Sequence, residues 1–432
     1  MKNKRIYLFL TLLLIAVFIT VFCACNNNDT EYISAYEIAV KNGFNGTEEE
    51  WLKQLHTTNT VENTPITYNT SVDSAHDVSV AANIGLKSAV SIYCTHTVIT
   101  NSWFGQSQTK QAQSAGSGVI YSLEDNGSAY IITNHHVVYE NSNNTSNHIS
   151  DDIKVFLYGM EGNEYAIPAT YVGGSLNYDI AVLRIENSAV LKKAIDARTV
   201  AAVEIADSNN VRPGQLSIAI GNPEAEGISV TSGIVSVDSE YIDMTAVDNR
   251  TKISLRVIRT DTAVNSGNSG GGLFDDTGKL IGIVNAKSGE ENVENIAYAI
   301  PSNVARAIAD NIIYYSPLMN KQCVMRVLLN VTVQTSGLST TISEEDGFIN
   351  KLEQVTIASI MDGSIVKDKL EVGDIINSVT IGDKITKITR QYMFIDALLD
   401  ARVGTDVKIG YTRNGQQETA TITITKDCLT EY

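Results

Sequence analysis

The chain has 432 residues, of which 43% are hydrophobic, and a formal net charge of −17. Its length predicts roughly two or three domains, and its apolar content is sufficient for sizeable cores. The acidic balance argues against nucleic acid and anionic lipid surfaces as partners, because both carry negative charge.

Residues 1–25 have the pattern of an export signal. Three basic residues precede an almost wholly apolar run, Ile6–Val21, and the segment ends at Ala24 and Cys25. This resembles a bacterial lipoprotein signal, which implies cleavage before Cys25 and a lipid on that cysteine. The alternative is an uncleaved membrane anchor, since the apolar run is about long enough to span a bilayer. Both interpretations put the rest of the chain on the outer face of the cytoplasmic membrane.

Residues 26–80 are rich in Asn, Thr, Ser and acids and are predicted to form a tether. Within it, Thr47 and Glu50 have the spacing of a helix capping box just before Trp51. The surrounding segment resembles a short helical unit found in surface proteins of Gram-positive bacteria. A small helical hairpin or spacer is the simplest interpretation.

Cysteines are few beyond residue 25. Cys94, Cys323 and Cys428 are widely spaced, and no Cys-x-x-Cys motif or Cys/His cluster accompanies them. We therefore expect no zinc site and no other metal or cofactor. A disulfide between two of the three is possible in an exported chain, and the sequence does not select the pair.

Residues 82–316 have the texture of a β domain. Short apolar runs alternate with Gly, Asn and Asp turns, a pattern typical of a sandwich or barrel. The clearest predicted strands are Ala89–Tyr93, Val119–Ser122, Tyr130–Thr133, Ile153–Tyr158, Ile180–Ile185, Leu216–Ile220, Gly227–Val237 and Leu280–Asn285. Helical periodicity is confined to Ser302–Ile312.

Residues 322–427 are predicted to be a separate module. Strands are expected at Val324–Val333 and Val355–Ile360, and a helix at Gln391–Ala401. Asn414-Gly415 lies between two β-prone runs, which is a strong signal for a final hairpin.

One heptapeptide, Ser266–Gly272, surrounds Ser269 with glycines. Glycine permits the positive φ angles of a tight turn in which a serine hydroxyl is exposed and amides converge on one oxygen. Such amides stabilise the oxyanion of acyl transfer, so Ser269 is a candidate nucleophile. A purely structural glycine turn is the alternative.

A serine nucleophile needs a base, and the base needs a partner that fixes its tautomer. Among the six histidines only His135 and His136 follow a clear buried strand, which ends at Asn134. Asp179 precedes the apolar run Ile180–Leu183, where an unpaired carboxylate would be costly. A histidine N–H would pair it. Adjacent side chains diverge, so only one of the two histidines is expected to serve, and they are not expected to share a metal.

Chain order separates two enzyme classes. Gly267–Gly271 matches the G-x-S-x-G elbow of α/β-hydrolases, but those enzymes place serine before acid and histidine. Here the order is His136, Asp179, Ser269, and a predicted hairpin with a turn near Gly278 follows the serine instead of a helix. This order is that of the chymotrypsin arrangement.

At this point a family resemblance is plain. The chain resembles HtrA/DegP-type serine proteases in seven segments that occur in the family's order: Gly116–Ile120, Thr133–Val138, Tyr178–Leu183, Ala219–Pro223, Val230–Ser236, Thr260–Gly271 and Ala297–Ser302. The resemblance implies two six-stranded β-barrels with His136 and Asp179 on the first and Ser269 on the second. It also implies an oxyanion hole made by the amides of Gly267 and Ser269, with Asn268 as a further candidate.

Two departures and one specificity site follow from the same resemblance. His135 replaces the family's Asn or small residue, and Glu224–Glu226 replaces an aromatic-glycine turn. The residue six before the serine would form the base of the S1 pocket, where no carboxylate is present to pair a basic side chain. Small aliphatic P1 residues are expected, and the predicted pocket residues are Ala263, Val264, Ile283 and Ala286.

The C-terminal module resembles the PDZ domains appended to these proteases. A PDZ domain adds a peptide strand to a sheet edge and holds its carboxylate in a backbone nest. The matching loop, Arg326–Val331, contains Leu328, Leu329 and Asn330 and lacks the usual glycines. Family members are often trimers, so a homotrimer is a further implication.

Taken together, the sequence predicts an extracytoplasmic, membrane-tethered serine endopeptidase. Its expected substrates are unfolded or misfolded proteins and peptides, and its expected role is protein quality control. The alternative is a peptide-binding or chaperone-like surface protein whose protease domain is idle.

Overall fold

The computed structural model of the chain describes residues 40–41, 45–47, 50, 78–101, 107–140, 147–285, 295–343 and 347–432. Contacts divide the chain into two compact units, Met1–Asp73 and Ser74–Tyr432. Among the described residues no helix is long and apolar enough to cross a membrane. The expected export signal with Cys25, and most of the tether, lie outside them.

The first unit shows the predicted capping box. The Thr47 amide donates to Glu50 Oε2 at 2.8 Å, and the Glu50 amide donates to Thr47 Oγ1 at 3.3 Å. These two reciprocal bonds satisfy amides that the start of a helix otherwise leaves without partners.

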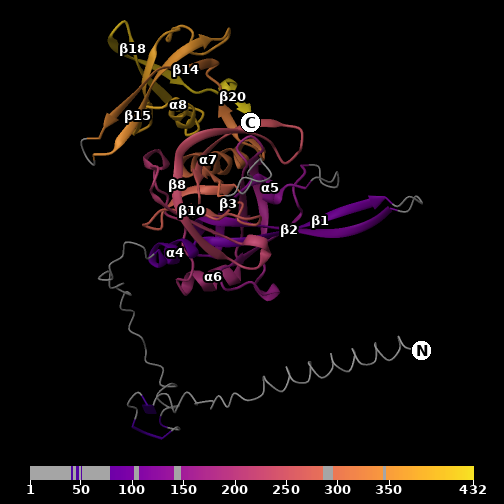
Figure 1. Cartoon of the computed structure of the whole chain (residues 1–432). Helices are drawn as coiled ribbons and strands as arrows, with labels where there is room; N and C mark the ends of the chain where they lie inside the picture. Colours follow the sequence, from indigo (N-terminus) through magenta and orange to yellow (C-terminus); the bar gives the residue numbers. More distant parts are fainter. Residues whose placement is uncertain are drawn as a thin grey trace, which may run out of the picture. The chain divides into compact units, whose positions relative to one another are not determined.

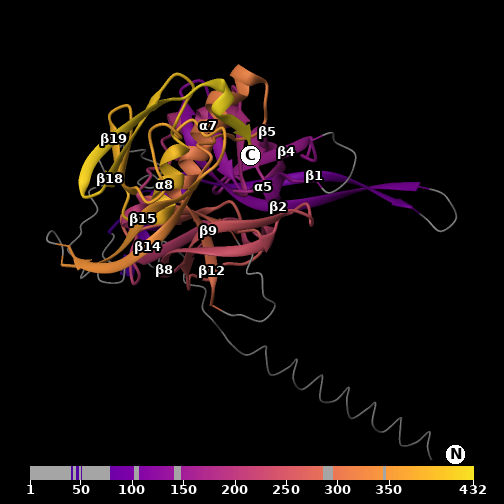
Figure 2. The same ribbon diagram turned by 90° about the horizontal axis from the view of Figure 1, so that it is seen from above.

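The second unit begins with a closed six-stranded barrel in the order β1-β2-β3-β6-β5-β4. Its strands are β1 (Ala89–Asn101), β2 (Ser107–Glu124), β3 (Ser128–Thr133), β4 (Asp152–Leu157), β5 (Ile167–Ser175) and β6 (Ile180–Ile185). The ends of β1 and β2 extend beyond the barrel as a long hairpin (Figures 1 and 2). Buried aliphatic side chains such as Val90, Ile131 and Leu183 fill its interior.

A second closed barrel follows, in the order β10-β11-β12-β9-β8-β7. Its strands are β7 (Leu216–Gly221), β8 (Ser229–Thr245), β9 (Lys252–Thr260), β10 (Gly272–Phe274), β11 (Leu280–Asn285) and β12 (Ala297–Pro301). The hairpin predicted after Ser269 is present as β10 and β11, and Gly278 has φ +79° in its turn. The expected mainly β fold with two six-stranded barrels is confirmed.

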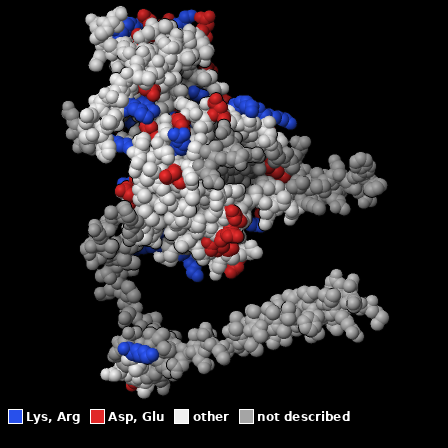
Figure 3. Space-filling model, in the orientation of Figure 1, with Lys and Arg blue, Asp and Glu red and all other residues white. Residues whose placement is uncertain are grey.

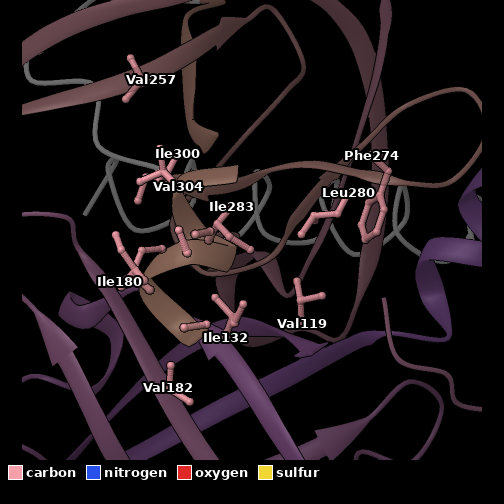
Figure 4. Close-up of a cluster of buried hydrophobic side chains, with 14 of the residues drawn as sticks. Val119, Ile132, Ile180, Val182, Val257, Phe274, Leu280, Ile283, Ile300 and Val304 are labelled. Carbon is pink, nitrogen blue, oxygen red and sulfur yellow. The ribbon is translucent and has the colours of Figure 1, made fainter. Parts of the chain in front are cut away.

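Helices cover the barrels. They are α4 (Ser79–Leu86), α5 (His135–Val138), α6 (Ala189–Asp196) and α7 (Ser302–Met319). One buried cluster joins both barrels to α7, and Figure 4 shows Ile132 and Val182 of the first barrel near Ile283 and Ile300 of the second. This shared core fixes the two barrels against each other, which positions any site at their boundary.

The C-terminal module contains one sheet in the order β14-β15-β16-β18-β19, with β17 also paired to β16. Its strands are β14 (Val331–Ile342), β15 (Ile349–Ile360), β16 (Ile375–Ile381), β17 (Lys384–Lys387), β18 (Asp406–Arg413) and β19 (Gln416–Thr423). The helix α8 (Gln391–Leu398) packs on this sheet, and a small separate sheet pairs β13 (Met325–Val327) with β20 (Leu429–Glu431). The hairpin predicted at Asn414-Gly415 is confirmed, with both residues at positive φ.

The strand predicted at Val324–Val333 is wrong as a single element. It is divided into β13 and β14 by a turn in which Asn330 has φ +55°. Asparagine adopts this left-handed conformation more readily than most residues, so an apolar run that contains it can still turn.

Charged side chains of both signs are distributed over the described surface. On the face shown in Figure 3, Lys and Arg form no continuous patch.

Candidate active site

His136 and Asp179 form a close pair in the first barrel. His136 lies in α5, which directly follows β3, and Asp179 lies in the turn between β5 and β6. His136 Nδ1 is 2.6 Å from Asp179 Oδ2, and the His136 backbone N–H donates to Asp179 Oδ1 at 2.9 Å. Both carboxylate oxygens therefore hold the same histidine, one through its ring and one through its backbone.

The Asp179 turn is itself fixed by further hydrogen bonds. Asp179 has φ +50°, an unusual conformation for a residue other than glycine. Its carbonyl accepts from the His135 backbone N–H at 3.2 Å and from Asn134 Nδ2 at 2.9 Å. Across the barrel boundary, Asn285 Nδ2 donates to Asp179 Oδ2 at 2.9 Å.

Asn285 and Asn134 were not predicted as site residues. Asn285 is the last residue of β11, and Asn134 directly follows β3. Both are almost fully buried. A buried amide side chain needs hydrogen-bond partners, so an asparagine at the end of an apolar strand was the sequence signal that could have identified these two residues.

Burial would raise the pKa of the Asp179 carboxyl, but the charge of His136 and hydrogen bonds from the His136 ring and backbone hold that pKa below its usual value. Asp179 is thus kept ionised although it is only 6% exposed.

The glycine turn around Ser269 packs against the first barrel. Gly267 and Gly270 have φ +98° and +84°, as the sequence predicted for such a turn. A Cβ on Gly270 would lie 2.2 Å from the Ser117 carbonyl oxygen and 2.3 Å from Thr133 Oγ1. Because Thr133 is the last residue of β3, the neighbour of Ser269 touches the strand that leads to His136.

Two hydrogen bonds orient the backbone before Ser269. The Glu224 amide donates to the Ser266 carbonyl at 2.9 Å, and Ser117 Oγ donates to the Gly267 carbonyl at 2.7 Å. In a trans peptide the N–H points away from the carbonyl, so the Gly267 N–H is directed opposite to Glu224. Since Asn268 donates its own amide to the Asn265 carbonyl at 3.1 Å, that amide is committed to the turn and does not serve an oxyanion hole.

Comparisons with known proteins identify relatives of this chain. Residues 116–283 match the model of the trypsin-like peptidase domain. The serine protease Do-like HtrA of Bacillus subtilis (strain 168) is 33% identical over 334 residues, which cover 74% of this chain and 67% of the relative. This chain belongs to the HtrA family of serine proteases.

Two further relatives illustrate the family. The periplasmic pH-dependent serine endoprotease DegQ of Escherichia coli (strain K12) is 30% identical over 72% of this chain and 59% of its own length. The solved structure of the HtrA-type protease AlgW with a tripeptide covers 82% of this chain and 98% of its own, with 25% identity and a TM-score of 0.49. By its family, this HtrA protease is a serine endopeptidase.

The predicted S1 residues of this HtrA protease are in different environments. Ala263 is exposed, and its carbonyl accepts from Thr231 Oγ1 at 2.7 Å, while Val264 is half-buried. Ile283 is fully buried in the core with Phe274 and Leu280 (Figure 4), so it does not line an open pocket, and that prediction is wrong. All six residues of β11 are buried, so this strand exposes none of its side chains. Ala286 lies outside the described residues.

His135 points away from the Asp179 carboxylate. Its Nδ1 is 3.5 Å from the Tyr171 hydroxyl, and a Cβ on Gly174 would lie 2.6 Å from the same atom. Burial lowers the pKa of His135 to about 4, so its ring is neutral at physiological pH. Within the described residues no group of three His, Cys, Asp or Glu side chains could hold a metal ion.

The loop predicted to bind peptide carboxylates lies between β13 and β14. Leu328 is exposed and Leu329 is buried, and Asn330 adopts the left-handed conformation that a glycine would otherwise supply. The loop precedes β14, an edge strand of the module sheet. The missing glycines therefore do not prevent a glycine-like backbone at Asn330.

Proposed function

We propose that His136, Asp179 and Ser269 form the catalytic triad of this protease. The observation that carries the proposal is the 2.6 Å contact between His136 Nδ1 and Asp179 Oδ2, together with a glycine turn in which Gly270, the residue after Ser269, lies against the end of β3. With its Nδ1 held by the carboxylate, His136 keeps Nε2 as the nitrogen that would accept the proton of the serine hydroxyl.

The chemistry follows from these positions. His136 takes the Ser269 proton as the hydroxyl oxygen attacks a peptide carbonyl, and Asp179 stabilises the imidazolium. The Gly267 and Ser269 amides hold the oxyanion of the tetrahedral intermediate. His136 then protonates the leaving amine, and water releases the acyl group from Ser269.

Export, a membrane tether and a role in protein quality control are also proposed. The basic and apolar N-terminal segment that ends at Cys25 supports export and a membrane tether, through a lipid or an uncleaved helix. Mass spectrometry of the mature N-terminus should find a lipid on Cys25 if the chain is a lipoprotein. Unfolded or misfolded proteins are the proposed substrates, in extracytoplasmic quality control.

The C-terminal module is proposed to be a PDZ-like peptide-binding domain. Its support is the edge strand β14, which follows the Leu328–Asn330 loop, and the nearby helix α8. A bound chain end would add a strand to β14 and place its carboxylate at that loop.

A labelling and digestion experiment tests the triad. A fluorophosphonate probe and casein are each given to the wild type, Ser269→Ala and Ser232→Ala, which changes an exposed serine on β8. Labelling and cleavage should be lost only in Ser269→Ala. Labelling that survives this substitution would refute Ser269 as the nucleophile.

A further inference from the structure

The last residues of the chain are tied to the segment that joins the barrels to the module. β20 (Leu429–Glu431) pairs with β13 (Met325–Val327), and the Tyr432 amide donates to the Val324 carbonyl at 2.9 Å. Lys321 Nζ lies 2.7 Å from Glu431 Oε1. We call residues Leu429–Tyr432 the terminal strap.

The strap ends against the neighbour of the catalytic carboxylate. The ring of Tyr432 contacts the ring of Tyr178 with centroids 5.2 Å apart and planes at 52°. The guanidinium of Arg326, on β13, covers the Tyr432 ring at 4.7 Å from its centroid. Tyr178 immediately precedes Asp179, so one aromatic contact separates the module from the Asp179 turn.

The other side of the same region is also held by the chain between barrel and module. The Gly174 amide donates to the Gln322 carbonyl at 3.1 Å, and Gln322 Nε2 donates to the Tyr171 carbonyl at 3.2 Å. Gly174, which donates, and Tyr171, which accepts, both belong to β5, and β5 leads directly into the Asp179 turn. The turn is therefore flanked by residues from both ends of the module, at Gln322 and at Tyr432.

Asp179 is sensitive to such support because of its backbone. At φ +50° it occupies a conformation that costs free energy and persists only when its surroundings impose it. We propose that Tyr432 is a positioning residue of this protease, which packs against Tyr178 and thereby holds Asp179 in register with His136.

The strap also connects to the proposed peptide-binding loop, and this step rests on the proposed function. The Leu328 amide donates to the Cys428 carbonyl at 2.8 Å, one residue before the strap. The strap and the proposed loop therefore belong to one short hydrogen-bonded ladder.

Steady-state kinetics on a chromogenic peptide test the proposal, with full-length wild type, Tyr432→Ala and Tyr432→Phe. Loss of the ring should lower kcat about tenfold with little change in KM, because a small displacement of a catalytic group affects the transition state. The acid limb of the kcat/KM profile should move to lower pH, since a displaced carboxylate stabilises the protonated ring of His136 less. Tyr432→Phe keeps the ring and should behave as the wild type.

Tyr158→Ala, which removes a 53% exposed tyrosine beyond β4, is the matched control. Unchanged kcat and pH profile in Tyr432→Ala would overturn the proposal. If Tyr432→Ala folds poorly, it is replaced by a double-mutant cycle of Tyr432→Leu, Tyr178→Leu and the variant with both changes. Non-additive effects on kcat support the interaction of the two tyrosines, and additive effects refute it. Hydrolysis that persists in Ser269→Ala would instead refute the triad, whatever the tyrosine variants do.

Discussion

At the scale of single residues, Asp179 combines burial, ionisation and an unusual backbone angle. Its two carboxylate oxygens accept from the ring and backbone of His136, and Asn285 adds a third bond. An amide in its place would keep the size but would offer an N–H where the histidine also has one. The resulting tautomer would leave His136 unable to accept the serine proton.

Asp179→Asn should therefore reduce kcat by about 10⁴-fold while the protein stays folded. Peptide hydrolysis measures the rate, and near-ultraviolet circular dichroism checks the fold. A variant that retains more than about a tenth of the wild-type kcat would contradict the assigned role.

His135 gives a prediction on stability against pH. Its pKa is lowered by burial to about 4, below the ordinary value of 6.5. The unfolded chain therefore takes up a proton first as the pH falls, and the stability contributed by the neutral ring is lost between pH 6.5 and about 4. His135→Asn should flatten this dependence, by about 3 kcal/mol over the window.

Urea unfolding of wild type and His135→Asn at pH 7 and pH 4.5 measures the difference. If the free energy of unfolding depends on pH equally in the two proteins, the buried His135 ring does not contribute to that dependence. The control is the interval from pH 7 to pH 8, in which the two proteins should change alike.

Strand ends and chain order restricted the candidates to Asp179, Ser269 and one of two adjacent histidines, and the family resemblance selected His136. Two of the supporting residues, Asn285 and Ser117, escaped prediction. Each makes its contact across the barrel boundary, to residues more than a hundred positions away. No local pattern in the sequence reports such a partner.

At the scale of elements, the turn that replaces the family's aromatic-glycine pattern is strained. Glu224 and Ala225 both have positive φ, at 56° and 61°, within the short helix η3 (Pro223–Ala225). Hydrogen bonds hold this turn: the Glu224 amide donates to the Ser266 carbonyl, and the Tyr93 hydroxyl donates to the Ala225 carbonyl at 3.3 Å.

Ala225→Gly should relieve this strain and stabilise the protein by about 1 kcal/mol, because glycine adopts positive φ without steric cost. Thermal unfolding measures the change, and Ala263→Gly, at an exposed position whose φ is not positive, is the control and should not stabilise. If Ala225→Gly unfolds at a lower temperature than the wild type, the backbone of Ala225 is not strained in the folded protein.

Element boundaries depended on the same kind of backbone angle. The apolar run from Val324 to Val333 favoured one strand, and the positive φ of Asn330 divides it. The Asn414-Gly415 hairpin was predictable because that dipeptide directly encodes two positive φ angles. Asn330 has no glycine neighbour, so its turn depends on the surrounding packing.

At the scale of the whole second unit, ion pairs connect the module to the barrels. Arg256 of β9 lies 2.6 Å from Asp396 of α8, and the Arg256 side chain is only 5% exposed. Arg306 of α7 binds Asp400 at 2.8 Å, and Arg390 binds Asp238 of β8 at 2.9 Å. Burial raises the pKa of Asp396 against the opposing effect of Arg256, so this pair is held at a desolvation cost.

Asp396→Leu should destabilise the protein by about 3 kcal/mol, because it leaves the Arg256 charge buried without its partner. The double variant Arg256→Met/Asp396→Leu should recover most of this loss. Urea unfolding of the two variants and the wild type measures both effects. If the double variant is no more stable than Asp396→Leu alone, the unpaired Arg256 charge is not the cause of the lost stability.

The strand pattern predicted only a sandwich or barrel, and the two-barrel architecture was expected from the family resemblance. The docking of the module was not predictable, because a single sequence does not state which of its 32 basic and 49 acidic residues will meet. Arg256 and Asp396 are 140 residues apart, and neither has a local signature.

The division of the reactive groups between two barrels has a consequence for biogenesis. His136 and Asp179 belong to the barrel that emerges first from the ribosome, whereas Ser269 and Asn285 belong to the second barrel, which is made later. Folding units form in this order during synthesis. A chain whose synthesis has passed only the first barrel therefore carries the proposed base without the proposed nucleophile.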